Sequence, residues 1–129
     1  MKRLLVLLVA ITGLLLSGCA DNIVSPELNS EAHVPLTCAN KQQCDLYWSR
    51  AQIWISDHSF FRIQTVTDTV LNTYGPDQYN HISWQISRIP NADGSARIKI
   101  NPNCDIQILC VKQVYQDVVS LKEYVRSGS

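Results

Sequence analysis

Two pairs of cysteines with the same spacing restrict the fold of this chain more than any other feature. Five residues separate Cys38 from Cys44, and five separate Cys104 from Cys110. The pairs bracket the segment that carries most of the apolar patterning. A domain of this size has a limited core, and covalent crosslinks supplement such cores. We therefore expect residues 38–129 to form one small, disulfide-stapled domain.

The first residues have the pattern of an export signal. Lys2-Arg3 precedes an uncharged, mostly apolar run from Leu4 to Leu16, and Asp21 ends the apolar stretch. This run is shorter than the roughly 20 residues that a membrane-spanning helix needs. The tetrad Leu16-Ser17-Gly18-Cys19 resembles the lipobox of bacterial lipoproteins. The alternatives, a plain membrane anchor and an ordinary secretory signal, fit the tetrad less well.

The lipobox resemblance, which covers residues 1–19, implies how the chain is processed. It implies a diacylglyceryl thioether on Cys19, cleavage before that residue, and a further acyl chain such as palmitate on the new N-terminus. Enteric lipoproteins retained in the inner membrane carry Asp after the acylated cysteine, whereas Ala20 follows it here. The expected location is therefore the outer membrane, facing the periplasm.

The expected organisation has three parts. A signal peptide occupies residues 1–18, an acylated cysteine and flexible tether residues 19–37, and a folded domain residues 38–129. Lys2 and Arg3 leave with the signal peptide, so nine lysines and arginines face eleven acidic residues, a net charge of −2. Nucleic-acid partners need a concentrated positive stripe, so we expect none.

With Cys19 acylated, four cysteines remain, and in an exported domain they indicate two disulfides. A zinc site with four cysteine ligands is the alternative, but paired cysteines in such sites are usually two to four residues apart. Of three connectivities we predict Cys38–Cys44 and Cys104–Cys110. The first would fix the entry to a helix, and the second would clamp the corner between the last strand and the last helix. Cross-pairing would instead tie the two ends of the domain together.

Apolar periodicity predicts an α+β domain with the order α-β-β-β-α. Asn40 and Gln43 form a helix-capping pattern, and the helix that follows ends near Ser56–Ser59. Three segments have strand character: 60–74 with a bulge near Thr65–Thr67, 82–87 and 96–101. A second helix runs from Cys110 to the tail. We expect a three-stranded antiparallel meander flanked by an N-terminal and a C-terminal helix.

Nothing in the sequence indicates catalysis. His58 and His81 are the only histidines of residues 38–129, and no nucleophile elbow, zinc-protease motif or phosphate-binding loop is present. Asp57, His58 and Ser59 are adjacent, but adjacent side chains point in different directions and do not make a triad. We expect no catalytic residue, no metal and no cofactor beyond the lipid on Cys19.

A candidate partner surface follows from the strand alternation. Trp54 and Trp84 fall on predicted core faces, whereas Trp48 lies at the edge of the helical stripe and is a candidate aromatic anchor. Polar side chains should line the open face of the sheet, where a mildly basic surface is expected: Arg62, Arg97 and Lys99, with Gln64, Ser83, Gln85 and Ser87.

Three classes of function fit a chain of this kind. The leading hypothesis is a non-enzymatic lipoprotein, anchored to the membrane by its lipid, that binds an envelope protein, a cell-wall partner or a secretion component. The second is a periplasmic inhibitor or immunity-type lipoprotein that blocks a lytic enzyme through the loop at Gly75–Asn80 or at Asn91–Ser95. An enzyme is the third.

Overall fold

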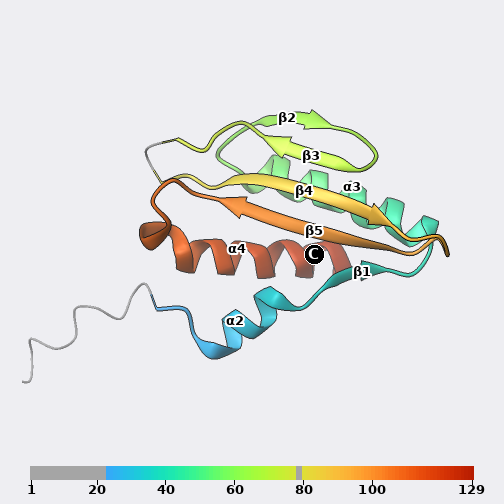
Figure 1. Cartoon of the computed structure of the whole chain (residues 1–129), viewed down its shortest axis with the longest axis horizontal. Helices are drawn as coiled ribbons and strands as arrows, with labels where there is room; N and C mark the ends of the chain where they lie inside the picture. The colour runs from blue at the N-terminus through green and yellow to red at the C-terminus, as the bar shows by residue number, and fades with distance from the viewer. Residues whose placement is uncertain (1–22, 78–79) are drawn as a thin grey trace, which may run out of the picture.

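The computed structural model describes residues 23–77 and 80–129 (Figure 1). In these residues three helices and five strands follow one another along the chain. The helices in these residues are α2 (Pro26–His33), α3 (Lys41–His58) and α4 (Gln107–Ser127). The strands are β1 (Leu36–Cys38), β2 (Ile63–Val66), β3 (Val70–Thr73), β4 (Ser83–Pro90) and β5 (Ala96–Asn103). They form one antiparallel sheet in the order β1-β5-β4-β3-β2, so the fold is α+β.

The sheet is covered by helices on one face only. Helices α3 and α4 pack against each other beneath the strands, and α2 packs against α4 (Figure 1). In the described part of the chain no element covers the opposite face, where Ser83 is buried and the other side chains are exposed or partly exposed. The molecule is therefore a two-layer domain with a free sheet surface.

Helix α3 begins and ends where the sequence predicts. The side chain of Asn40 accepts a hydrogen bond from the backbone N–H of Gln43 at 2.9 Å, and Gln43 Oε1 accepts one from Ala39 N–H at 2.7 Å. This reciprocal arrangement satisfies two free donors at the helix start. The apolar side chains of Leu46 and Ile53 lie outside the buried stripe of this helix, since both are exposed.

The prediction of a three-stranded meander is wrong, because the sheet has five strands. Residues 60–74, predicted as one bulged strand, form the hairpin of β2 and β3. Thr67 closes its turn: its N–H donates to Val70 O, and its hydroxyl accepts from the N–H groups of Thr69 and Val70. The bulge predicted near Thr65–Thr67 is therefore a reversal of the chain. A smaller irregularity lies between Ile63 and Thr65.

The remaining added strand lies in the stretch expected to be a flexible tether. Ser25 caps α2, with Pro26 in its first turn, and β1 pairs with β5 through Leu36 opposite Ile98. Lys122 of α4 is buried, and its ammonium donates to the carbonyl oxygens of Ala32 and Val34. Residues 26–37 are thus folded onto the domain, whereas Cys19 and its lipobox lie outside the described residues.

The core lies between the sheet and the two long helices. Trp84 of β4 meets Trp54 of α3 edge to face, with ring centroids 5.5 Å apart. Leu71, Ile86 and Leu121 are fully buried beside them. Burial of each such side chain stabilises the fold by roughly 1.5–3 kcal/mol. The expectation that Trp54 and Trp84 belong to the core is confirmed.

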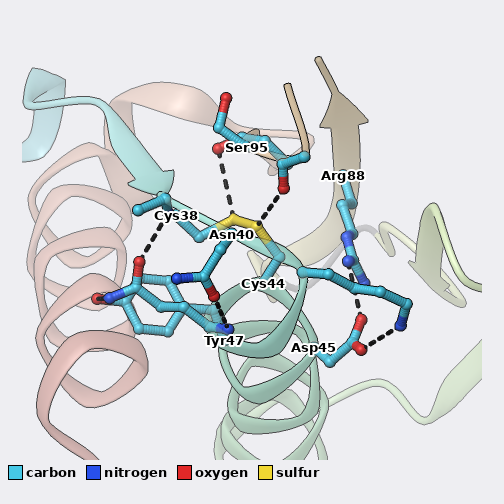
Figure 2. The surroundings of a disulfide bond; sticks show 12 residues. Cys38, Asn40, Cys44, Asp45, Tyr47, Arg88 and Ser95 are labelled. Carbon is cyan, nitrogen blue, oxygen red and sulfur yellow. Dashed lines mark hydrogen bonds and ion pairs between the residues drawn. A yellow bond between two sulfur atoms is a disulfide. The ribbon is translucent and has the colours of Figure 1, made fainter. Parts of the chain in front are cut away.

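Both disulfides join the cysteines that the sequence analysis pairs. Cys38–Cys44 links β1 to the first turns of α3, and Cys104–Cys110 links the end of β5 to the start of α4. Figure 2 shows the first bridge beneath the β4–β5 turn, where Cys44 Sγ lies 3.9 Å from the carbonyl oxygen of Gly94. This bridge therefore supports a turn distant in sequence as well as its own corner.

Candidate functional site

The open face of the sheet is a regular array of side chains set by the strand register. Directly opposed residues of an antiparallel pair share a face, so the Cα partners define rows that cross the sheet. One row runs through Thr65, Asn72, Gln85 and Asn101, on β2, β3, β4 and β5. The neighbouring rows are Val70, Ser87 and Lys99, and then Ile89, Arg97 and Thr37.

Asn72, Gln85 and Asn101 of the first row line a shallow groove of about 460 Å³, and on β2 the groove is lined by Gln64. Its floor carries the carboxamides of Asn72, Gln85 and Asn101, and Gly75-Pro76 borders it. Each carboxamide offers both donors and acceptors. The Asn72 carboxamide oxygen is buried and accepts no hydrogen bond from the described residues. A groove of this composition can bind an extended polar ligand through hydrogen bonds.

Arg97 and Lys99 add positive charge next to the groove. Both are exposed on β5, two residues apart, and neither forms an ion pair with another described residue. Arg88 differs: it lies on the helix side, 2.8 Å from Asp45. Hydrogen bonds from Lys41 and then Arg88 lower the pKa of Asp45 (Figure 2). The two cations of the open face therefore remain available to a partner.

Two of the predicted polar residues add no exposed side chain beside Arg97 and Lys99. Arg62 is exposed, but it lies before β2, three strands away from β5. At about 4.8 Å between strands, that separation is on the order of 14 Å. Ser83, predicted on the same face, does line the groove, but the residue is buried and its hydroxyl donates to Asn103 O. The structure thus brings together Arg97 and Lys99 but not Arg62.

Trp48 is not an exposed aromatic anchor, and that prediction is wrong. Only 5% of the residue is accessible, and its indole N–H donates to Thr67 O at 2.9 Å. The β2–β3 hairpin, which the sequence did not reveal, covers the ring. Trp48 therefore holds this hairpin against α3.

The histidines have structural partners. His58 stacks on Trp54 with ring centroids 4.5 Å apart, and its Nδ1 lies 2.9 Å from Trp54 O at the end of α3. His81 Nδ1 lies 2.9 Å from a carboxylate oxygen of Asp77 and the ring stacks on Phe60. Over residues 23–77 and 80–129, no three His, Cys, Asp or Glu side chains come together as metal ligands. None of the helices described is long and apolar enough to cross a membrane.

Two loops were predicted as alternative contact sites. The Asn91–Ser95 loop is tightly hydrogen bonded: Asn91 N–H donates to Ser95 O at 2.8 Å, and Asp93 accepts from both the N–H and the hydroxyl of Ser95. These bonds lower the pKa of Asp93. Residues 78 and 79 of the Gly75–Asn80 loop lie outside the described residues.

Comparison with protein-family models, curated proteins and solved structures found no match. The function is therefore argued from the residues and from their arrangement on the sheet.

Proposed function

We propose that this protein is a non-enzymatic lipoprotein, anchored through Cys19 in the outer membrane and facing the periplasm. Its open sheet face would bind an envelope protein, a cell-wall component or part of a secretion assembly. The anchor rests on the lipobox resemblance. The binding role rests mainly on the row of carboxamides beside Arg97 and Lys99, because no described element covers these side chains.

The composition of this face indicates the chemistry of its partner. Carboxamides form hydrogen bonds without a charge preference, whereas Arg97 and Lys99 favour carboxylates or phosphates. The planar guanidinium of Arg97 can bind a carboxylate through two parallel hydrogen bonds. The partner class supported best is a polar, mildly acidic surface or strand that lies along the sheet.

The anchor is tested by metabolic labelling with radioactive palmitate. We expect label on the wild-type chain and none on Cys19→Ala, which should stay unprocessed or become soluble in the periplasm. Absence of label from the wild type would refute the anchor.

The binding face is tested by crosslinking and capture from cell envelopes. Lys99→Glu should reduce capture of the partner. Lys41→Glu is a matched control: it reverses an exposed lysine at the start of α3, whose surface ion pair with Asp45 contributes little. Equal capture by both variants would rule out the open face.

A second candidate, inhibition of a lytic enzyme, is supported by the Asn91–Ser95 loop. Its internal hydrogen bonds and the Cys38–Cys44 bridge beneath it hold it in one conformation. Preorganised loops lose little entropy on entering a cleft. Capture that survives Lys99→Glu but is lost in Asp93→Ala would favour this candidate.

A further inference from the structure

Exposed apolar side chains gather at one end of the domain, where α4 begins. Ile106, Ile108 and Leu109 are 42%, 76% and 53% accessible. The Cys104–Cys110 disulfide spans this segment and fixes it against the end of β5. An apolar cluster held rigidly in water is unusual for a monomeric domain and marks an interaction site.

The connectivity brings further apolar side chains to the same end. Antiparallel pairing places Ile63 opposite Thr73 and Ser83 opposite Asn103, so the entry to β2 and the exit from β3 lie at the same end of the sheet as the end of β5. Phe60, 66% accessible, precedes β2, and Tyr74, 50% accessible, follows β3. Figure 1 shows these connections at the left end of the long axis, together with the start of α4.

The expected lipid site is tied to this end. The segment leading into α2, drawn in blue, enters the domain from the same side in Figure 1. It begins with Ile23, which is 68% accessible. Cys19 lies four residues earlier, and four residues span at most about 14 Å when fully extended. An acyl chain on Cys19 would therefore keep this end of the domain close to the membrane surface.

We propose that this apolar end docks on the membrane, with Ile106, Ile108 and Leu109 in the interface between headgroups and acyl chains. The inference rests on the proposed acylation of Cys19. Apolar side chains at the interface add to the binding energy of a lipid anchor, and the lipid holds them in place. The strands, which run along the long axis, then stand away from the membrane (Figure 1). The β4–β5 turn and the Cys38–Cys44 bridge become the distal tip, and the open face stays accessible from the side.

The test measures the depth of an introduced tryptophan. The full chain carrying Ile108→Trp is purified in its acylated form and reconstituted in vesicles of phosphatidylethanolamine and phosphatidylglycerol, with and without brominated acyl chains. Ile89→Trp is the matched control, because Ile89 is also exposed but lies near the distal end of β4. The wild-type signal from the native tryptophans is subtracted.

We expect brominated lipid to quench the added emission at position 108 several-fold more than at position 89. Equal quenching in protein that carries the palmitate label would overturn the docking proposal and leave the anchor intact. A wild-type chain without label would overturn the anchor and, with it, the premise of docking. Emission at position 108 that shifts with the protein-to-lipid ratio but is not quenched would assign the patch to a second copy and contradict membrane docking.

Discussion

The two faces of the sheet are built from the same strands but differ in burial, because one packs on the helices and no described element covers the other. In β4, Trp84 and Ile86 point into the helix layer and are buried, whereas Gln85 and Ser87, which alternate with them, point outward. In β5, Ile98 is buried, and Arg97 and Lys99 on either side of it are exposed. Both strands therefore turn alternate residues towards the helices and leave most of the others exposed or partly exposed.

This division has a physical basis in the two-residue repeat of a strand. Neighbouring side chains point to opposite faces, so a change on one face need not disturb packing on the other. The helix-covered face tolerates little change in volume, because its side chains are close-packed. On the open face, one polar side chain can replace another without loss of the fold.

The largest contrast is expected between two adjacent residues of β4. Trp84→Ala removes a buried ring that packs edge to face on Trp54, and it should lower the free energy of unfolding by roughly 3–5 kcal/mol. Gln85→Ala should change it by less than about 0.5 kcal/mol. Urea unfolding of both variants gives the comparison, and similar midpoints would contradict the division between the faces.

A smaller effect is expected at Trp48. Trp48→Phe keeps an aromatic ring but removes the indole N–H that donates to Thr67 O, so it should cost about 1–2 kcal/mol. Capture of the partner should be unchanged, since this side chain lies under the β2–β3 hairpin. Lost capture with unchanged stability would restore Trp48 as a partner anchor. Thermal unfolding and envelope capture measure the two effects.

Reversal of both cations on the open face should separate binding from stability. Arg97→Glu combined with Lys99→Glu should change the unfolding free energy by less than about 0.5 kcal/mol, because both side chains are exposed. Partner association should weaken, and the difference from wild type should be larger at low salt, where screening is least. An association constant that does not respond to the reversal at any ionic strength would move the site to the loops.

The smallest effect is expected from Asp117 in the helix layer. Its pKa is raised above its usual 3.8 because burial removes hydration, partly offset by the hydrogen bond from Gln113. Protonated Asp117 therefore favours the folded state. This contribution to the free energy of unfolding is complete below pH 3.8 and is lost as the pH rises through the raised pKa. Asp117→Asn should therefore stabilise at pH 7, within about 0.5 kcal/mol, and the gain should fade in acid.

Asp45→Asn is the control for Asp117→Asn, because the pKa of Asp45 is shifted in the opposite direction. Hydrogen bonds from Lys41 and Arg88 lower the pKa of Asp45, so its contribution is present above pH 3.8 and is lost as the pH falls through the lowered pKa. This variant should be less stable than the wild type at pH 7 and equal to it in strong acid. Unfolding midpoints from pH 2 to pH 7 test both variants, and parallel curves would show that neither carboxyl responds to its surroundings.

Features encoded within one element were predictable from the sequence. The cap at Asn40, the buried stripe through Trp54 and Ile55, and the alternation around Trp84 are local, and the structure contains them. The disulfide pairing could also be predicted from the sequence, because each bridge joins the start of a helix to the residues just before it.

Features that depend on distant pairing were missed. The turn at Thr67-Asp68-Thr69 has Asp68 as its single common turn residue and no glycine or proline, so a hairpin could not be told from a bulge. The burial of Trp48 follows from that hairpin. Strand β1 is too short for any period, and its partner lies some sixty residues later. A signal for α2 was present, however: Ser25, Pro26 and Glu27 form the usual start of a helix.

The short β1 strand also affects how copies of this protein meet one another. Strand β1 pairs with β5 only from Ala96 to Ile98. The remaining part of β5 contains Pro102, which has no N–H to donate to a neighbouring strand. Helix α2 lies alongside, where Ala32 and His33 share a groove with Ile100 and Pro102. An edge interrupted in this way is a poor template for a strand from a neighbouring molecule. Crowded copies are thereby kept from joining into a continuous intermolecular sheet along this edge.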